Sequence, residues 1–279
     1  MDLSWLESLT YGFVSGFADI LPVSAQAHRI LLLKVFGHTG RSDLLQVMIY
    51  LGIFAALYFT SQKHLVRMTR AMKLSRVPKR RRKRPLDIRS MMDFRFLRTV
   101  LLPVILGLFL YRYVKFISDT LLYVVLLLFL NGVILYVPQY MPTGNRDSRT
   151  LSRVEGLLMG LGGAAGILPG ISGVGTATAV ASICGVDRNY GLTMALMMNM
   201  VFSAGMAVIS FLSLLSNGLV ETLSFMMLLR YLVTGLAAFG GTLLAVRIMR
   251  SMASNNGYGL FGFYCWGMAL FTFILNILV

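Results

Sequence analysis

Two apolar segments of this chain are each interrupted by a proline that is followed closely by a serine. The first interruption reads Asp19-Ile-Leu-Pro-Val-Ser24 and the second reads Gly166-Ile-Leu-Pro-Gly-Ile-Ser172. Proline removes a backbone donor and disfavours helix at the residue before it. At bilayer depth a broken helix is tolerated only where protein or a wet cavity surrounds the freed backbone groups. The two breaks therefore predict a polar site inside a membrane protein.

The composition agrees with a membrane protein. Hydrophobic residues make up 57% of the 279 residues and charged residues 13%, whereas a soluble domain carries about 25% charged residues. Several apolar runs reach the length of about 17 residues that can cross a bilayer. The N-terminal segment lacks the basic start and small-residue cleavage pattern of a signal peptide, so we expect it to be retained.

We predict an all-α integral membrane protein with six transmembrane helices and two re-entrant helical hairpins, in a single membrane domain over 1–279. The first half, 1–138, comprises a hairpin at 5–21 and 25–37 and spans at 44–60, 94–111 and 119–138. The second half, 139–279, comprises a polar linker at 139–153, a hairpin at 154–168 and 173–185, and spans at 189–213, 226–247 and 258–278. Because the order of elements matches, we favour an inverted repeat, with a polar site where the broken segments meet. Two prolines that arose independently are the alternative.

The basic residues predict the orientation in the membrane. The net charge is +15, and more than half of the 26 Lys and Arg residues lie between Lys63 and Arg98. Such a block beside a span is typical of a cytoplasmic loop, which places loop 61–93 inside and the N-terminus outside. Anionic lipid head groups are a second expected partner of this loop. The position of this basic block beside a span argues against nucleic-acid binding. The sequence leaves open whether the protein forms a homo-oligomer.

The first break carries the ionisable candidates. Asp19, His28 and Arg29 lie in apolar surroundings, where ionisable side chains are expected to pair with each other or to face a cavity. A pair between Asp19 and either Arg29 or His28 across the break is the functional interpretation. A purely structural ion pair, or an Arg29 side chain that extends to the outer interface, is the alternative.

The second break offers groups that suit phosphate. Small and hydroxylated residues follow its proline, so backbone N–H groups and hydroxyls can approach phosphate oxygens. Tight helix packing in lipid is the alternative explanation for the small residues. The candidate residues here are Gly170, Ser172, Gly173, Gly175 and Thr176.

A family resemblance runs through these motifs. Gly12-Phe-Val-Ser-Gly-Phe-Ala-Asp19-Ile-Leu-Pro-Val-Ser24-Ala-Gln-Ala-His28 resembles the first signature of the bacterial undecaprenyl pyrophosphate phosphatases, the bacitracin-resistance family. Val47-Met-Ile-Tyr-Leu-Gly52 and Pro169-Gly-Ile-Ser-Gly-Val-Gly175 are similar to two further family motifs, and order and spacing match over nearly the whole chain.

The resemblance implies a bacterial inner-membrane enzyme built as an inverted repeat of re-entrant helices. Such enzymes remove the terminal phosphate of undecaprenyl pyrophosphate on the outer side of the membrane, which recycles the carrier lipid for cell-wall synthesis. They use a divalent cation, Mg²⁺ or Ca²⁺. Carried over to this chain, the resemblance makes Asp19 the metal ligand, His28 the general acid or base and Ser24 the nucleophile or a substrate contact. Ser172 and its neighbouring N–H groups would hold phosphate.

The chain departs from the family pattern at positions that matter for chemistry. The family's first glutamate falls at Ser15, its glutamine at Tyr50 and its second-signature arginine at Gly173. Loss of an arginine that stabilises a transferring phosphoryl group costs about 10³–10⁵ in rate. We therefore expect Arg29 to supply the missing positive charge. A non-catalytic carrier or flippase for a polyprenyl phosphate is the main alternative to a phosphatase, and transport of an unrelated small solute is a third possibility.

Overall fold

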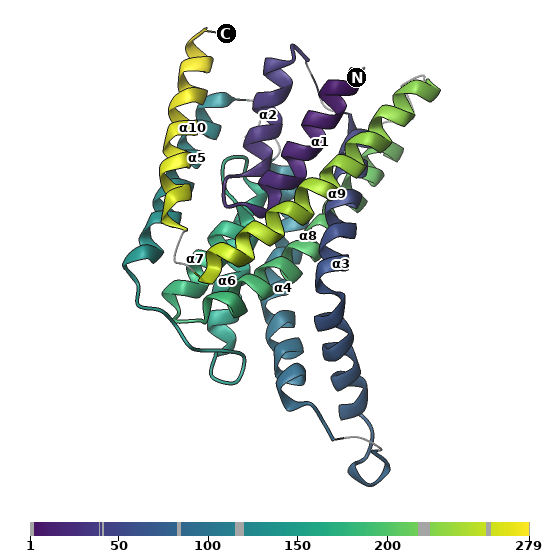
Figure 1. The fold of residues 1–279 in the computed structure, drawn as a ribbon, viewed down its shortest axis with the longest axis vertical. Helices are drawn as coiled ribbons and strands as arrows, with labels where there is room; N and C mark the ends of the chain where they lie inside the picture. The colour runs from purple at the N-terminus through teal and green to yellow at the C-terminus, as the bar shows by residue number, and fades with distance from the viewer. Residues whose placement is uncertain are drawn as a thin grey trace.

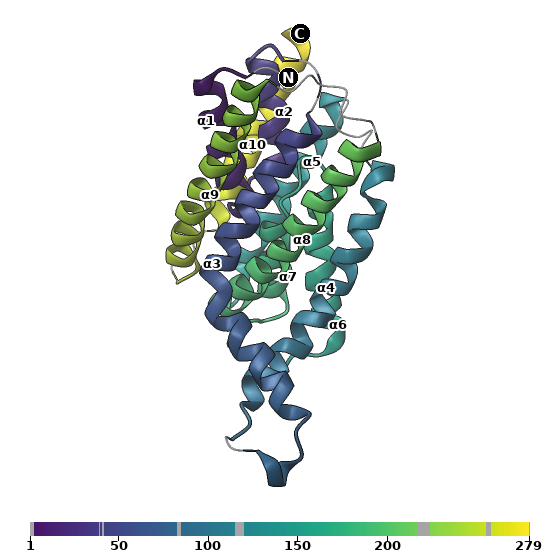
Figure 2. The same cartoon turned by 90° about the vertical axis from the view of Figure 1, so that its right-hand side faces the viewer.

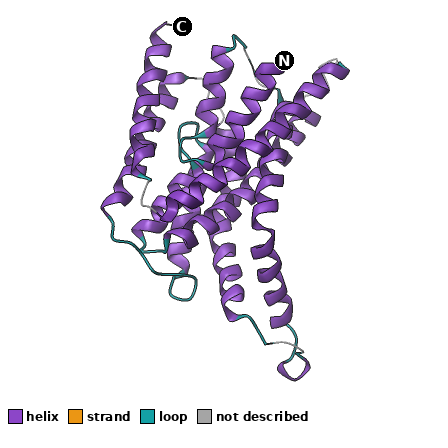
Figure 3. Ribbon diagram, viewed as in Figure 1, coloured by secondary structure: helices purple, strands orange, loops and turns teal. Residues whose placement is uncertain are grey.

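The computed structural model describes residues 3–38, 40, 42–82, 85–114, 120–216, 224–254 and 258–278. All the regular elements in these residues are helices, and six are long and apolar enough to cross a membrane (Figures 1 and 3). They are α3 (Asp43–Ser75), α4 (Ile88–Val114), α5 (Leu121–Tyr136), α8 (Arg188–Ser216), α9 (Phe225–Ser254) and α10 (Gly259–Leu278). The 3₁₀ turn that follows α5 extends it to a span of 20 residues. The predicted all-α class and the six spans are confirmed.

Four shorter helices form two hairpins, α1 (Trp5–Ile20) with α2 (Ala25–Val35), and α6 (Arg153–Ala164) with α7 (Gly173–Ile183). The longest has 16 residues and reaches about 24 Å, which is short of the ~30 Å hydrocarbon core. The open ends of each hairpin lie together, because His38 Nε2 is 3.5 Å from the Glu7 carboxylate and Arg146 pairs with Val186 in an isolated bridge. The hairpin shape is observed, and its placement in a bilayer stays a prediction.

The two hairpins begin with the same local signal. Ser4 caps α1 and Ser152 caps α6, and each serine exchanges hydrogen bonds with a glutamate three residues later, Glu7 and Glu155. This capping box satisfies the free N–H groups that every helix start leaves. The second helix of each hairpin also starts at a serine, Ser24 or Ser172, directly after the break.

The packing of the two halves follows one scheme. Hairpin helix α1 packs along α9 of the other half, and α6 packs along α4; α3 packs on α8, and α5 on α10. Exchanging the halves leaves this set of pairs unchanged. In Figure 1, α1 and α2 extend from the end of the molecule that carries the N-terminus, whereas α6 and α7 lie toward the opposite end. This arrangement is the one that the predicted inverted repeat requires.

Glycines allow the close contacts of the hairpin helices. A methyl group added to Gly12 or Gly16 of α1 would overlap the carbonyl of Thr234 or Ala238 in α9. In the other half, a methyl group on Gly160 of α6 would overlap the Val100 carbonyl of α4. Small residues at such crossings let helix backbones approach in lipid. Both hairpins are therefore held tightly against a helix of the opposite half.

The predicted basic loop at 61–93 is wrong in its extent. Helix α3 continues to Ser75 and α4 already begins at Ile88, so both helices reach beyond the rest of the molecule (Figure 2). The apolar run of the sequence ends near residue 60. The helix continues because Lys, Arg, Met, Leu and Ala are good helix formers and because Met68 and Ala71 are buried on one face of the extension. The predicted span at 119–138 corresponds to α5 and the 3₁₀ turn Val137–Tyr140, while residue 119 lies outside the described residues.

Candidate active site

The tips of the two hairpins bond directly to each other. Ser24 Oγ accepts a 2.9 Å hydrogen bond from the Gly170 N–H group, and Ser172 Oγ donates to the Leu21 carbonyl at 3.3 Å. Gly175 lies against Pro22, where a Cβ would come within 2.6 Å of the proline ring. The structure thus joins the two breaks that the sequence places more than 140 residues apart.

Asn131 of α5 ties both tips together and is fully buried. Its Nδ2 donates to the Pro22 carbonyl at 3.1 Å, and its Oδ1 accepts from the Ser172 N–H group at 2.9 Å. These bonds satisfy backbone groups that the breaks release from helical pairing. Our sequence analysis missed Asn131, although an asparagine in an otherwise apolar span is a signal for such a role.

Asp19 lies at the end of α1 beside the joined tips. Asn199 of α8 donates to Asp19 Oδ2 at 2.6 Å, and Arg29 Nη2 lies 3.6 Å from Asp19 Oδ1. The structure therefore pairs Asp19 with Arg29 rather than with His28. Asn199, a second buried asparagine, is also a site residue that our sequence analysis missed.

The Arg29 guanidinium is buried with unused donors. Its centre lies 4.6 Å from the centroid of the Tyr50 ring, and the residue is 7% exposed. Its Nε and Nη2 atoms have no hydrogen-bond partner among the described residues. A buried donor without a partner costs about 1–3 kcal/mol. A guanidinium in this state is suited to an anion with several oxygens, such as a phosphate group.

Two small cavities flank this ion pair, each of about 20 Å³. Asp19, Ser172 and Gly173 line one, and Arg29 lines the other. Gln26 and Tyr50 line both cavities. Because a volume of this size holds about one water, a pyrophosphate group requires the two cavities to join.

His28 faces away from Asp19. Its Nδ1 lies 2.8 Å from the Ser24 carbonyl, which only accepts, so Nδ1 carries the proton. Its Nε2 then accepts from the Tyr264 hydroxyl of α10 at 2.7 Å, and the two rings stack. His28 lines neither of the two cavities. Through these two contacts His28 connects the tip of the first hairpin to α10.

The remaining predicted residues serve the tips in different ways. Ser24 is the single non-glycine residue with positive φ, 66°, among the described residues, and such strained backbone is typical of functional sites. The Thr176 hydroxyl donates to the Ser172 carbonyl at 2.7 Å, inside its own helix. Gly170 has a φ of 125°, which an L side chain rarely adopts.

Gly173 has no room for the arginine that the family pattern places there. A Cβ at this position would lie 2.8 Å from the Gly163 carbonyl oxygen, and one built on Gly166 would come within 2.8 Å of the Gly173 Cα atom. The first turn of α7 therefore packs against the end of α6. The positive charge near Asp19 comes from α2 through Arg29 instead.

The residues around Asp19 do not suit a resident divalent cation. Mg²⁺ and Ca²⁺ prefer several oxygen ligands, with carboxylates foremost. Asp19 is the one carboxylate here; one of its oxygens faces the Arg29 cation and the other accepts from the Asn199 amide. No group of three or more His, Cys, Asp or Glu residues suited to a metal occurs in the described part of the chain.

Comparison with known proteins decides the family. The sequence profile of the bacitracin resistance protein BacA family matches residues 8–271. The chain belongs to this family. The region that matches the BacA family contains both breaks. Among the described residues it also contains all ten α-helices except the ends of α1 and α10.

Three relatives of this BacA family chain cover nearly its full length. The undecaprenyl-diphosphatase of Methanobrevibacter smithii is 26% identical over 98% of this chain and 98% of its own. Undecaprenyl-diphosphatase 1 of Shouchella clausii is 24% identical over 98% and 97%, and the undecaprenyl-diphosphatase of Prochlorococcus marinus is 25% identical over 93% and 94%.

Proposed function

We propose that this BacA family protein hydrolyses a polyprenyl pyrophosphate, with undecaprenyl pyrophosphate as the substrate, to the monophosphate and inorganic phosphate. The names of its full-length relatives support this activity. The observation that carries it in this chain is the buried Arg29. Its Nη2 forms an ion pair with Asp19, while Nε and Nη2 have no hydrogen-bond partner among the described residues.

The site residues divide into phosphate-binding and water-activating groups. Arg29 binds oxygens of the terminal phosphate, and the N-terminus of α7 at Gly173, which lines the cavity beside Asp19, adds the positive end of its helix dipole. Asp19 orients a water and accepts its proton as the water attacks the terminal phosphorus. The bond from that phosphorus to the bridging oxygen breaks, and the polyprenyl monophosphate leaves. We assign Ser24 and His28 to positioning, because both bond to the tip and line neither cavity.

The orientation is part of the proposal. The basic residues of the α3 and α4 extensions favour a cytoplasmic location for that end of the molecule. The N-terminus and the open end of the first hairpin then lie outside the bacterial inner membrane, where the head group of the substrate would be reached. We keep Mg²⁺ or Ca²⁺ as an expectation from the family resemblance; with only Asp19 available, such a cation would arrive bound mainly to the pyrophosphate oxygens.

Phosphate release from undecaprenyl pyrophosphate by purified protein in detergent tests this function. It would be measured with Mg²⁺, with Ca²⁺ and with chelator, for wild type, Asp19→Asn and Arg29→Gln. We expect each variant to lose at least about 10²-fold in turnover, since loss of a phosphate-clamping arginine costs that or more. Asp147→Asn is the matched control, because Asp147 pairs with Arg149 far from the tips. Wild-type turnover in Asp19→Asn would overturn the assignment.

A carrier or flippase for a polyprenyl phosphate is the second candidate. The packing that excludes an arginine at Gly173 favours it, because the chain keeps an anion-binding group while lacking one that family phosphatases use. Movement of a labelled polyprenyl phosphate across vesicles without phosphate release would support the carrier. Phosphate release that Arg29→Gln abolishes would exclude a purely non-catalytic role.

A further inference from the structure

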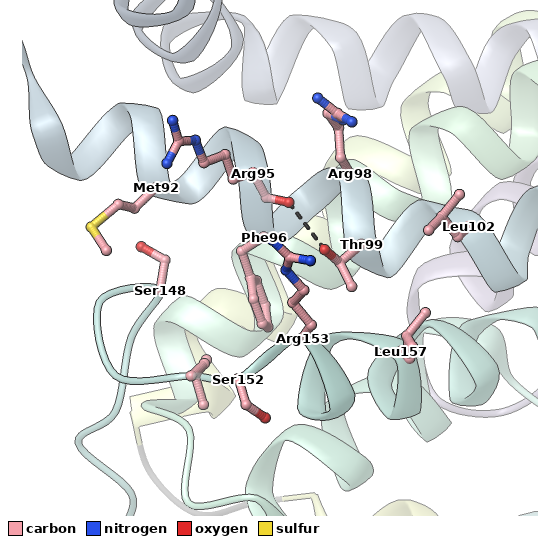
Figure 4. A pocket seen from close by; sticks show the side chains of 11 residues that line it. Met92, Arg95, Phe96, Arg98, Thr99, Leu102, Ser148, Ser152, Arg153 and Leu157 are labelled. Carbon is pink, nitrogen blue, oxygen red and sulfur yellow. Dashed lines mark hydrogen bonds between the residues drawn. The ribbon is translucent and has the colours of Figure 1, made fainter.

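A third, larger cavity lies at the opposite end of the fold from the N-terminus, between α4 and the start of α6. Its volume is about 650 Å³, which is the size of a small-molecule site. Three arginines line it, Arg95 and Arg98 from α4 and Arg153 from the first residue of α6. Figure 4 shows Arg153 extending from α6 toward α4, between Phe96 and Thr99.

The three guanidinium groups are unpaired. All three residues are exposed, and none forms an ion pair or a side-chain hydrogen bond with any residue in the described ranges. The nearby carboxylates are already occupied. Asp147 pairs with Arg149 and Arg89, and Glu155 pairs with Arg146.

The remaining carboxylate near the cavity, Asp93, accepts hydrogen bonds from Ser148 and Tyr190. The three arginines that line the cavity outnumber this one carboxylate, so the cavity keeps a net positive charge. In a protein of this class, a basic pocket between membrane helices on the cytoplasmic side is a site for an acidic lipid head group.

The walls of the cavity continue into apolar surface. Leu102 and Leu157 line it and are 57% and 37% exposed. One helical turn further along each helix, Leu106 and Leu161 are 63% and 58% exposed. These leucines form two exposed apolar rows on α4 and α6. A ligand that fits both parts has a phosphate group at one end and a hydrocarbon chain at the other.

We propose that this arginine cavity binds the phosphate head group of an anionic phospholipid of the cytoplasmic leaflet, with an acyl chain along the leucines of α4 and α6. The arginines then donate charge-assisted hydrogen bonds to phosphate oxygens at the membrane interface. The site is separate from the hairpin tips and independent of the proposed catalytic step, while its assignment to the cytoplasmic leaflet rests on the orientation given under the proposed function.

Native mass spectrometry of the full chain in neutral detergent tests the site directly. Phosphatidylglycerol and phosphatidylcholine would be titrated, and the apparent Kd of the first bound lipid measured. We expect wild type to prefer phosphatidylglycerol by at least about tenfold, and the triple variant Arg95→Gln/Arg98→Gln/Arg153→Gln to lose that preference. Arg153→Gln alone should lose about fivefold.

The matched control is Lys34→Gln/Arg247→Gln/Arg250→Gln, which removes the same charge from exposed positions of α2 and α9 outside the basic loop. It should keep the preference of the wild type. Equal losses in both triple variants, or none in the arginine variant, would overturn the proposal. Displacement of the lipid by millimolar inorganic phosphate, or tighter binding of a polyprenyl monophosphate than of phosphatidylglycerol, would also overturn the phospholipid assignment. Elution volume and thermal unfolding of each variant establish that it is folded.

Discussion

Arg29 Nη2 lies 3.6 Å from Asp19 Oδ1, although the break at Pro22 separates the two helices that carry these residues. The side chains are 8% and 10% exposed, so the pair is held away from bulk water. Each charge alone would be costly when buried. In the proposed function the pair offers a bound phosphate one cation and a bound water one proton acceptor.

The first prediction separates the structural role of this pair from its chemical role. Arg29→Gln leaves a buried carboxylate without its partner, so we expect a loss of about 3–5 kcal/mol in stability and a clear drop in the thermal midpoint. Adding Asp19→Asn removes the uncompensated charge and should restore most of the midpoint. Phosphate release should stay low in the double variant. If turnover returned together with stability, the pair would be structural only.

Tyr50 is expected to control access to the pair, because it lines both cavities and its ring lies over Arg29. Tyr50→Phe keeps the ring over Arg29 and should change kcat/KM by less than about twofold, since the cation–π contact is retained. Tyr50→Gln should raise kcat/KM by about tenfold where joining of the cavities limits binding. Steady-state phosphate release measures both, and a lower value for the glutamine variant would refute a gating role.

Asn131 is expected to hold the tips in register. Asn131→Leu leaves the Pro22 carbonyl and the Ser172 N–H group without these bonds, at about 1–3 kcal/mol for each buried group. We predict a lower thermal midpoint and reduced turnover together. Asn131→Asp separates the two bonds, because it keeps the oxygen that accepts from the Ser172 N–H group and loses the amide that donates to the Pro22 carbonyl. A midpoint equal to wild type in Asn131→Leu would contradict the bridging role.

The bond between His28 and Tyr264 predicts that the histidine positions rather than reacts. Tyr264→Phe removes the partner hydroxyl and should reproduce the effect of His28→Ala on turnover within about threefold, since both remove the same link to α10. The double variant should then be no worse than either single one. A far larger loss in His28→Ala, together with a shifted pH profile of kcat, would restore a general acid or base role.

The loop between α5 and α6 should show acid-sensitive stability. The Arg149 side chain donates to Asp147 and lowers the pKa of that carboxyl below its usual value. A lowered folded pKa gives stability that is present above the unfolded pKa, about 3.9, and is lost as the pH falls through the folded pKa. Because Arg149 is 62% exposed, we expect Asp147→Asn to cost about 0.2–1 kcal/mol near neutral pH. Thermal midpoints of wild type and variant should converge in acid; a constant difference would contradict this.

Much of the fold follows from local sequence. Runs of apolar residues of spanning length give the six long helices. The prolines at 22 and 169 mark the two breaks because each is followed by a serine that caps the next helix, whereas Pro103 lies inside α4 without ending it. The shared capping serines, Ser4 and Ser152, likewise mark both hairpin starts. The predicted span was shorter than α3 because the apolar run ends near residue 60. Helix-forming residues and the burial of Met68 extend the helix to Ser75.

The sequence by itself determined the class, the breaks and the residue types near them, since periodicity, proline and charge act over a few residues. Only the tertiary structure decided which of these residues meet. It selected Arg29 over His28 as the partner of Asp19, and brought in Asn131 and Asn199 from α5 and α8. It also closed the space beside Gly173. Those choices depend on how the two halves interlock, because a buried polar group pairs with whatever donor or acceptor the packing brings within reach.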